Sequence, residues 1–231
     1  MKAKLAIVAL ATLAAIGSAQ AVEVSTELAS VSIKAHDFEI DNTTSTSAKV
    51  LRVGLGHTFE LDNGVKLGGS VKVGKAVSTS DDASAFDGST YKGDLTARLT
   101  VGKAVGGVDL YGGLQHQRFE IDGPLSNVKQ SQNQAFVGVS IPKPLADLPS
   151  LQSVSFEAGT VLGSTLKDSG DYGNGWETFT VKNNGGSVFK VAAAFKAGDY
   201  TISPFVASAS PSADMVKVKT SQVGVSVSRS F

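Results

Sequence analysis

The last nine residues alternate strictly between apolar and small or polar side chains, and the chain ends on an aromatic residue, Phe231. Val223, Val225 and Val227 occupy one set of alternate positions, and mainly glycine and serine occupy the other. Successive side chains of a β-strand point to opposite faces, so this pattern predicts a strand with one apolar and one polar face. Such a strand has to find its hydrogen-bond partners in a sheet, which favours an all-β fold.

The same alternation recurs along the chain and predicts ten strands. In the first of them, Ala29, Val31 and Ile33 form the apolar face and Lys34 lies on the polar face. The fifth and ninth patterns are the weakest, so eight strands are the alternative. The ten segments cover residues 28–38, 49–60, 65–75, 93–102, 108–120, 133–141, 153–162, 187–197, 200–208 and 219–231.

The beginning of the chain has the pattern of a secretory signal peptide. Lys2 and Lys4 precede an apolar run from Leu5 to Ile16, and Ala19-Gln20-Ala21 is a small-x-small cleavage site. The apolar run is too short to span a membrane as a helix. We therefore expect residues 1–21 to be removed and residues 22–231 to form one domain.

A membrane location for this domain requires a closed barrel, because no other stretch is apolar enough for a membrane helix and an open sheet would leave backbone groups unpaired in lipid. The terminal strand ending on Phe231 resembles the C-terminal signature of small bacterial outer-membrane β-barrel proteins of the opacity-like type, although Arg229 departs from it. The resemblance implies a closed antiparallel barrel in the Gram-negative outer membrane, inserted by the barrel-assembly machinery, with lipid and lipopolysaccharide around it.

Transmembrane barrels have short periplasmic turns and longer outer loops. The connections near 61–64, 103–107 and 197–199 are short, whereas 76–92 and 163–186 are long and polar.

Charge and composition narrow the range of functions. Removing Lys2 and Lys4 leaves 19 basic residues against 21 acidic ones, a net charge of about −2 that argues against a nucleic-acid partner. The chain has no cysteine and only three histidines, and it shows no local hydrolase or protease motif, so we expect no enzyme, no metal site and no cofactor. Glycine pairs within strands do not have the context of a phosphate-binding loop.

The polar faces of the predicted strands carry charged residues that should line the lumen. In a small barrel side chains nearly fill the interior, and charges buried there must be paired. The two interpretations are a polar plug that holds the barrel together and a narrow pore with a basic lining. The predicted lumenal network consists of Lys34, Arg52, Lys72, Arg98, Glu157 and Lys190.

Two function classes follow from the sequence. The first is a structural or interaction barrel, similar to adhesins and opacity-like proteins, whose loops contact a host, phage or cell-surface ligand. Tyr172 and Trp176, in the glycine-rich segment 163–186, are the candidates for such a contact, because exposed aromatic residues dominate many interfaces. The second is a passive, narrow porin for small solutes.

Overall fold

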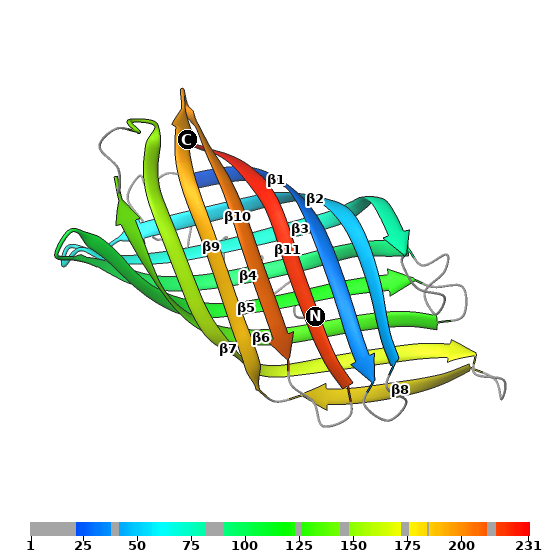
Figure 1. The fold of residues 1–231 in the computed structure, drawn as a ribbon. Helices are drawn as coiled ribbons and strands as arrows, with labels where there is room; N and C mark the ends of the chain where they lie inside the picture. Colours follow the sequence, from blue (N-terminus) through cyan, green and yellow to red (C-terminus); the bar gives the residue numbers. More distant parts are fainter. Residues whose placement is uncertain are drawn as a thin grey trace.

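The computed structural model describes residues 22–37, 42–81, 90–122, 126–143, 148–171, 176–183, 185–211 and 216–231. The predicted signal peptide lies outside these residues. None of the described segments is a helix of the length and apolar character that a membrane crossing requires. Strands make up almost all of the described chain (Figure 1). They are β1 (Val22–Asp37), β2 (Asn42–Glu60), β3 (Val65–Asp81), β4 (Thr90–Val105), β5 (Val108–Asp122), β6 (Ser126–Pro142), β7 (Leu151–Asp171), β8 (Trp176–Asn183), β9 (Gly186–Ala197), β10 (Tyr200–Pro211) and β11 (Val216–Ser230).

Ten of these strands close into an antiparallel barrel. Consecutive strands pair from β1 to β7 and from β9 to β11, β7 pairs with β9, and β1 pairs with β11, so the ring has no gap. β8 stands outside the ring, on the edge visible in Figure 1, because it pairs only with the distal part of β7. The antiparallel barrel of ten strands predicted from the sequence is confirmed, and the alternative of eight strands is wrong.

Both described ends of the chain and the short hairpins lie at one end of the barrel, which we call the turn end. Asn63-Gly64 forms the predicted tight turn between β2 and β3, where Gly64 has a φ of 74° and the Asn63 carboxamide accepts a hydrogen bond from the Val65 amide. Gly106 and Gly107 turn the chain between β4 and β5, again with positive φ. Glycine reaches this backbone region without steric cost, which explains its position in these turns.

A band of exposed apolar side chains surrounds the barrel next to the turn end. On β2, Leu51, Val53 and Leu55 point outward and are about half exposed, while Arg52 and Gly54 between them are buried. Such a band on a closed barrel is the surface expected to face lipid hydrocarbon. Other members of this band, which we call the apolar belt, are Val24, Leu28, Val73, Leu99, Val101, Leu110, Leu114, Val137, Phe156, Phe189, Ile202, Val206, Val223, Val225 and Val227.

The strands continue well beyond the apolar belt, and there the two faces exchange character. A membrane crossing needs roughly 9–11 strand residues, whereas β1 has 16 and β7 has 21. On β1 the inward face changes from Ser25 and Glu27 to Ala29 and Val31, all of which are buried. On the outward face, Leu28 is followed by Ser30 and Ser32. This outer half therefore has an apolar interior and a polar exterior, as in a water-soluble barrel. Its buried core consists of Ala29, Val31, Ile33, Ala48, Val50, Tyr91, Phe119, Ile121 and Phe205.

The inversion corrects two sequence-based expectations. The apolar face of the first segment, with Ala29, Val31 and Ile33, points into the barrel rather than toward lipid. Much of the sequence expected to form long outer loops is strand, since β3 extends to Asp81 and β7 to Asp171. Both errors have one physical explanation: the surface beyond the apolar belt is that of a barrel surrounded by water, where polar side chains belong on the outside.

Candidate functional site: the charged lumen

The largest charged cluster lies in the lumen where the apolar belt gives way to the outer half. Strand register brings its members together, because Glu27 of β1 is opposite Arg52 of β2, and Gly74 of β3 lies between Arg52 and Asp94 of β4. A Cβ atom at Gly74 would come within 2.7 Å of Arg52 Cγ and would also collide with the Asp94 carboxylate. Glycine at this position therefore provides the space in which the two charged side chains meet across three strands.

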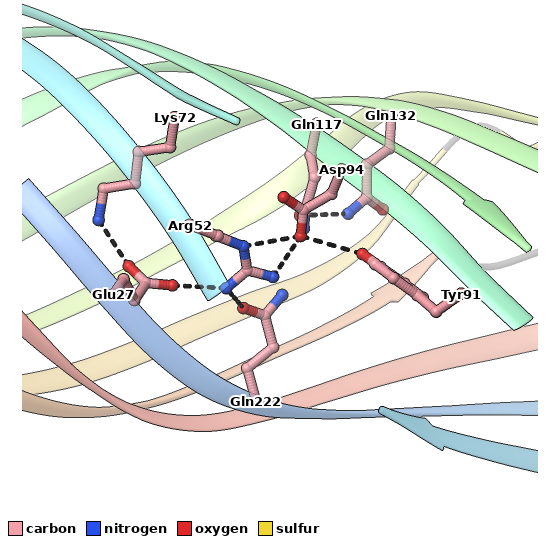
Figure 2. A network of polar contacts seen from close by, with 8 residues as sticks. All are labelled: Glu27, Arg52, Lys72, Tyr91, Asp94, Gln117, Gln132 and Gln222. Carbon is pink, nitrogen blue, oxygen red and sulfur yellow. Dashed lines mark hydrogen bonds and ion pairs between the residues drawn. The ribbon is translucent and has the colours of Figure 1, made fainter. Parts of the chain in front are cut away.

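Arg52 is the centre of this cluster, as Figure 2 shows. Its Nη1 donates to Glu27 Oε1 at 2.5 Å, and its Nε donates to Asp94 Oδ2 at 2.7 Å. Lys72 donates from Nζ to Glu27 Oε2 at 2.6 Å, and the Tyr91 hydroxyl donates to Asp94 Oδ2 at 2.9 Å. The Arg52 side chain is only 3% exposed, so two carboxylates and one guanidinium are held almost without water.

A second cluster lies nearer the turn end. Arg98 of β4 binds Glu157 of β7 through two parallel bonds, Nη1 to Oε2 at 2.9 Å and Nη2 to Oε1 at 2.7 Å. The Tyr111 hydroxyl donates to the same carboxylate at 3.1 Å, and the Arg98 guanidinium lies 3.9 Å from the centre of the Phe136 ring. Two-point pairing of this kind fixes orientation as well as charge. The clusters together tie β1, β2, β3, β4, β5 and β7 through the lumen.

Glutamines form a layer beside these clusters that the sequence analysis missed. Gln132 donates to Gln117 at 3.1 Å, and Gln130 donates to the Ser164 hydroxyl at 3.2 Å. Gln130, Gln132 and Gln134 are buried and recur at every second position of β6. That period of two, with amide side chains in place of apolar ones, was the available signal for an inward polar face.

Two members of the proposed lumenal network differ from the others. Glu27 lies on the inward face of β1, whereas Lys34 lies exposed on the outward face. The structure therefore contradicts the placement of Lys34 in the lumen. This error follows from the exchange of faces above Leu28. Lys190 of β9 does point into the lumen but makes no ion pair within 4.0 Å with any described carboxylate. Its Nζ lies 5.5 Å from the centre of the Phe205 ring, and Glu157, its cross-strand neighbour, attracts it only over a longer distance.

Little free space remains in the lumen around the clusters. One cavity of about 110 Å³ lies between them, bordered by Arg52, Arg98 and Lys190. A wider space of about 620 Å³ reaches toward the turn end and is bordered by Glu23, Glu60 and the same two side chains Arg98 and Lys190. In the opposite direction the buried apolar core fills the barrel. The lumen is therefore a vestibule at the turn end that is closed toward the outer half.

The described histidines do not form a catalytic arrangement with a serine and an acid. His116 points outward and its Nδ1 lies 2.9 Å from Asn133 Oδ1, and His57 packs edge-on against Phe59 at the turn end. The side chain of His36 lies outside the described part of the structure. Among the described residues no three histidine, cysteine, aspartate or glutamate side chains are grouped to hold a metal ion.

The remaining candidates lie at the two ends of the barrel. Tyr172 is outside the described residues; the backbone of Trp176 begins β8, and its side chain is not described. At the other end, Val223, Val225 and Val227 point outward in the apolar belt, and the Phe231 side chain is 70% exposed.

Comparison with known proteins supports the fold. No protein-family model matches the chain, and no curated protein is significantly similar to it in sequence. The outer membrane protease OmpT from Escherichia coli has a similar structure, with a TM-score of 0.60 and 10% sequence identity over 92% of this chain and 97% of OmpT. Neisserial surface protein A is also similar, with a TM-score of 0.42 and 12% identity over 92% of this chain and all of that protein.

Ring closure, the apolar belt and the likeness to OmpT define the class: this chain has the fold of a bacterial outer-membrane β-barrel. At 10% identity the likeness concerns the fold.

Proposed function

We propose that this protein is an outer-membrane barrel with a structural and interaction role at the cell surface, where its outer half presents a binding surface. The observation that carries the proposal is the exchange of faces along the strands. A barrel that only had to cross the membrane would not need an outer half with its own buried core and a polar exterior.

The described side chains on the exterior of the outer half are mostly basic. Among its described side chains, nine cations and only two acids, Glu120 and Asp122, point outward. We call these cations the basic collar: Lys34, Lys49, Lys75, Lys92, Arg118, Lys129, Lys167, Lys182 and Lys219. The mature chain as a whole is slightly acidic, so among the described side chains the collar gathers positive charge on one part of the surface.

Several collar residues stand next to like charges. Lys34 of β1 is directly opposite Lys219 of β11. Lys129 of β6 is opposite Lys167 of β7, although Lys129 also forms an ion pair with Glu120 at 3.0 Å. Like charges directly opposite each other destabilise a sheet. This arrangement is favourable when an anionic partner lies between or above the lysines.

The collar residues nearest the apolar belt match the position of the phosphate groups of lipopolysaccharide. Lys49 is two residues beyond Leu51, the last outward apolar residue of β2, and Lys75 is the cross-strand neighbour of Leu51. At roughly 3.3 Å per residue these ammonium groups lie just above the hydrocarbon boundary, where anionic headgroups attract lysine. Lipopolysaccharide is therefore the partner that we propose, with ligands on host cells or phage as the alternatives.

The collar variant Lys34→Gln/Lys219→Gln tests this function because it separates stability from binding. Removing the like charges should leave the unfolding temperature unchanged or slightly higher, while the affinity of the nanodisc-embedded barrel for lipopolysaccharide should fall severalfold at low salt and less at high salt. The control is Lys103→Gln/Lys196→Gln, which removes two exposed lysines near the turn end. Equal loss of binding in the control, or no loss in the collar variant, would contradict the proposal.

The narrow-porin hypothesis has less support. The lumen holds two ion-pair clusters, a cavity of only about 110 Å³ between them, and an apolar core above. Stable single-channel currents in the nanosiemens range from the refolded protein would nevertheless favour the pore.

We also propose that the protein is not an enzyme, which is consistent with the outward position of His116 and the aromatic packing of His57.

A further inference from the structure

Lys190 is a lumenal cation without a counter-ion among the described residues. It points inward from β9, and its cross-strand neighbour on β7 is Glu157. An ion pair would be expected from that register, but both oxygens of Glu157 accept hydrogen bonds from Arg98, and one also accepts from Tyr111. No carboxylate oxygen of the described chain lies within 4.0 Å of the Lys190 ammonium. The ammonium lies 5.5 Å from the centre of the Phe205 ring, and Glu157 attracts it only over a longer distance.

The charges in the middle of the lumen do not balance. Three carboxylates are present, and each is engaged: Glu27 by Arg52 and Lys72, Asp94 by Arg52, and Glu157 by Arg98. With Lys190 there are four cations, which leaves one positive charge uncompensated. A charge removed from bulk water without a partner is costly, so this excess favours an anion from solution.

The space for such an anion lies next to Lys190. Ser70, Lys72, Arg98 and Lys190 border both the cavity of about 110 Å³ and the vestibule of about 620 Å³, so they stand at the junction of the two. Three of these side chains carry a positive charge and the fourth has a hydroxyl that can donate. The vestibule connects the junction with the turn end, which provides an entry path.

We propose that this junction binds one small monovalent anion, a halide or a short carboxylate, with Lys190 as its principal counter-ion. One negative charge neutralises the excess. A cavity of about 110 Å³ holds three or four waters at roughly 30 Å³ each, which suits a small anion. Glu23, Glu60 and Lys66 also border the vestibule, and the two acids there disfavour anions with higher charge.

The test compares the wild type with Lys190→Met, which keeps the length of the side chain and removes its charge. The unfolding temperature of the refolded protein is measured at constant ionic strength while a bulky sulfonate is replaced by bromide or by acetate. Because an anion that binds only the folded barrel stabilises it, the wild-type temperature should rise and saturate. It should not respond in Lys190→Met, and it should respond normally in Lys103→Met, which removes an exposed cation near the turn end.

Crystals soaked in bromide give an independent readout that does not depend on stability. The proposal predicts an anomalous-scattering peak beside Lys190 in the wild type and in Lys190→Arg, and no such peak in Lys190→Met. A response to acetate without bromide binding would assign the site to carboxylates. Saturable stabilisation that persists in Lys190→Met, or bromide peaks only on the outer surface, would overturn the proposal and leave Lys190 as a hydrated side chain.

Discussion

Replacing Arg52 by methionine should lower the free energy of unfolding by about 3–5 kcal/mol, the typical cost of removing one partner of a buried ion pair. Arg52 is 3% exposed and binds both Glu27 and Asp94, so its loss leaves two negative charges in a space almost free of water. Lys72 still neutralises Glu27, but Asp94 keeps only the hydroxyl of Tyr91. Urea-induced unfolding of the refolded barrel, followed by circular dichroism, measures the change.

Two further variants identify the cause of this loss. Arg118→Met removes an exposed arginine of β5, whose nearest acid Glu120 is 3.9 Å away, and should cost less than about 1 kcal/mol. Adding Asp94→Asn to Arg52→Met removes the unpaired charge and should recover part of the stability. If Arg52→Met is as stable as Arg118→Met, the lumen is well hydrated at this level, and the closed barrel described above is wrong.

Deleting Phe231 should abolish insertion of the barrel into the outer membrane while leaving its thermodynamic stability nearly unchanged. The Phe231 side chain is 70% exposed, so it contributes little to the interior; its amide donates to the Val22 carbonyl at 3.1 Å, the last bond of the β1–β11 seam. The expected effect is therefore on assembly. Heat-modifiable migration of the membrane fraction should show little folded protein, with the signal peptide still removed.

The control for this deletion is Phe231→Trp, which keeps a terminal aromatic residue and should insert normally. The deleted chain, refolded from urea into detergent, should unfold within about 1 kcal/mol of the wild type, as expected for loss of one exposed side chain. Normal folded protein in the membrane fraction after the deletion would show that the terminal aromatic residue has no part in assembly. The outward row of Val223, Val225 and Val227 would then act only as part of the lipid-facing surface.

Much of the barrel could be predicted from alternation within the apolar belt. There lipid surrounds the barrel, so the apolar face is the outer one, and the inward positions of Arg52, Arg98, Glu157 and Lys190 follow from the pattern. The pattern fails where the surroundings change. The apolar pair Leu28-Ala29 on β1 is the sequence mark of this change, because apolar residues occupy successive positions when the faces exchange.

The contacts inside the lumen could not be predicted in the same way. Which inward residues meet depends on the register of neighbouring strands and on the inclination of the strands in the barrel. Alternation contains neither quantity, so the pairing of Arg52 with Glu27 and Asp94 was not predicted. Gly74 follows the alternation onto the inward face, but its role becomes visible only when both side chains beside it are known.

Single cysteines along β1 test most directly whether the outer half protrudes from the membrane with its faces exchanged. The natural chain has no cysteine, so each introduced thiol reports one position. Intact cells carrying Leu28→Cys, Val31→Cys, Ser32→Cys or Lys34→Cys are treated with a membrane-impermeant thiol reagent. We predict rapid labelling at Ser32 and Lys34, which face water, and protection at Leu28 in the apolar belt and at Val31 in the buried core. Labelling at Val31 together with protection at Ser32 and Lys34 would contradict this account.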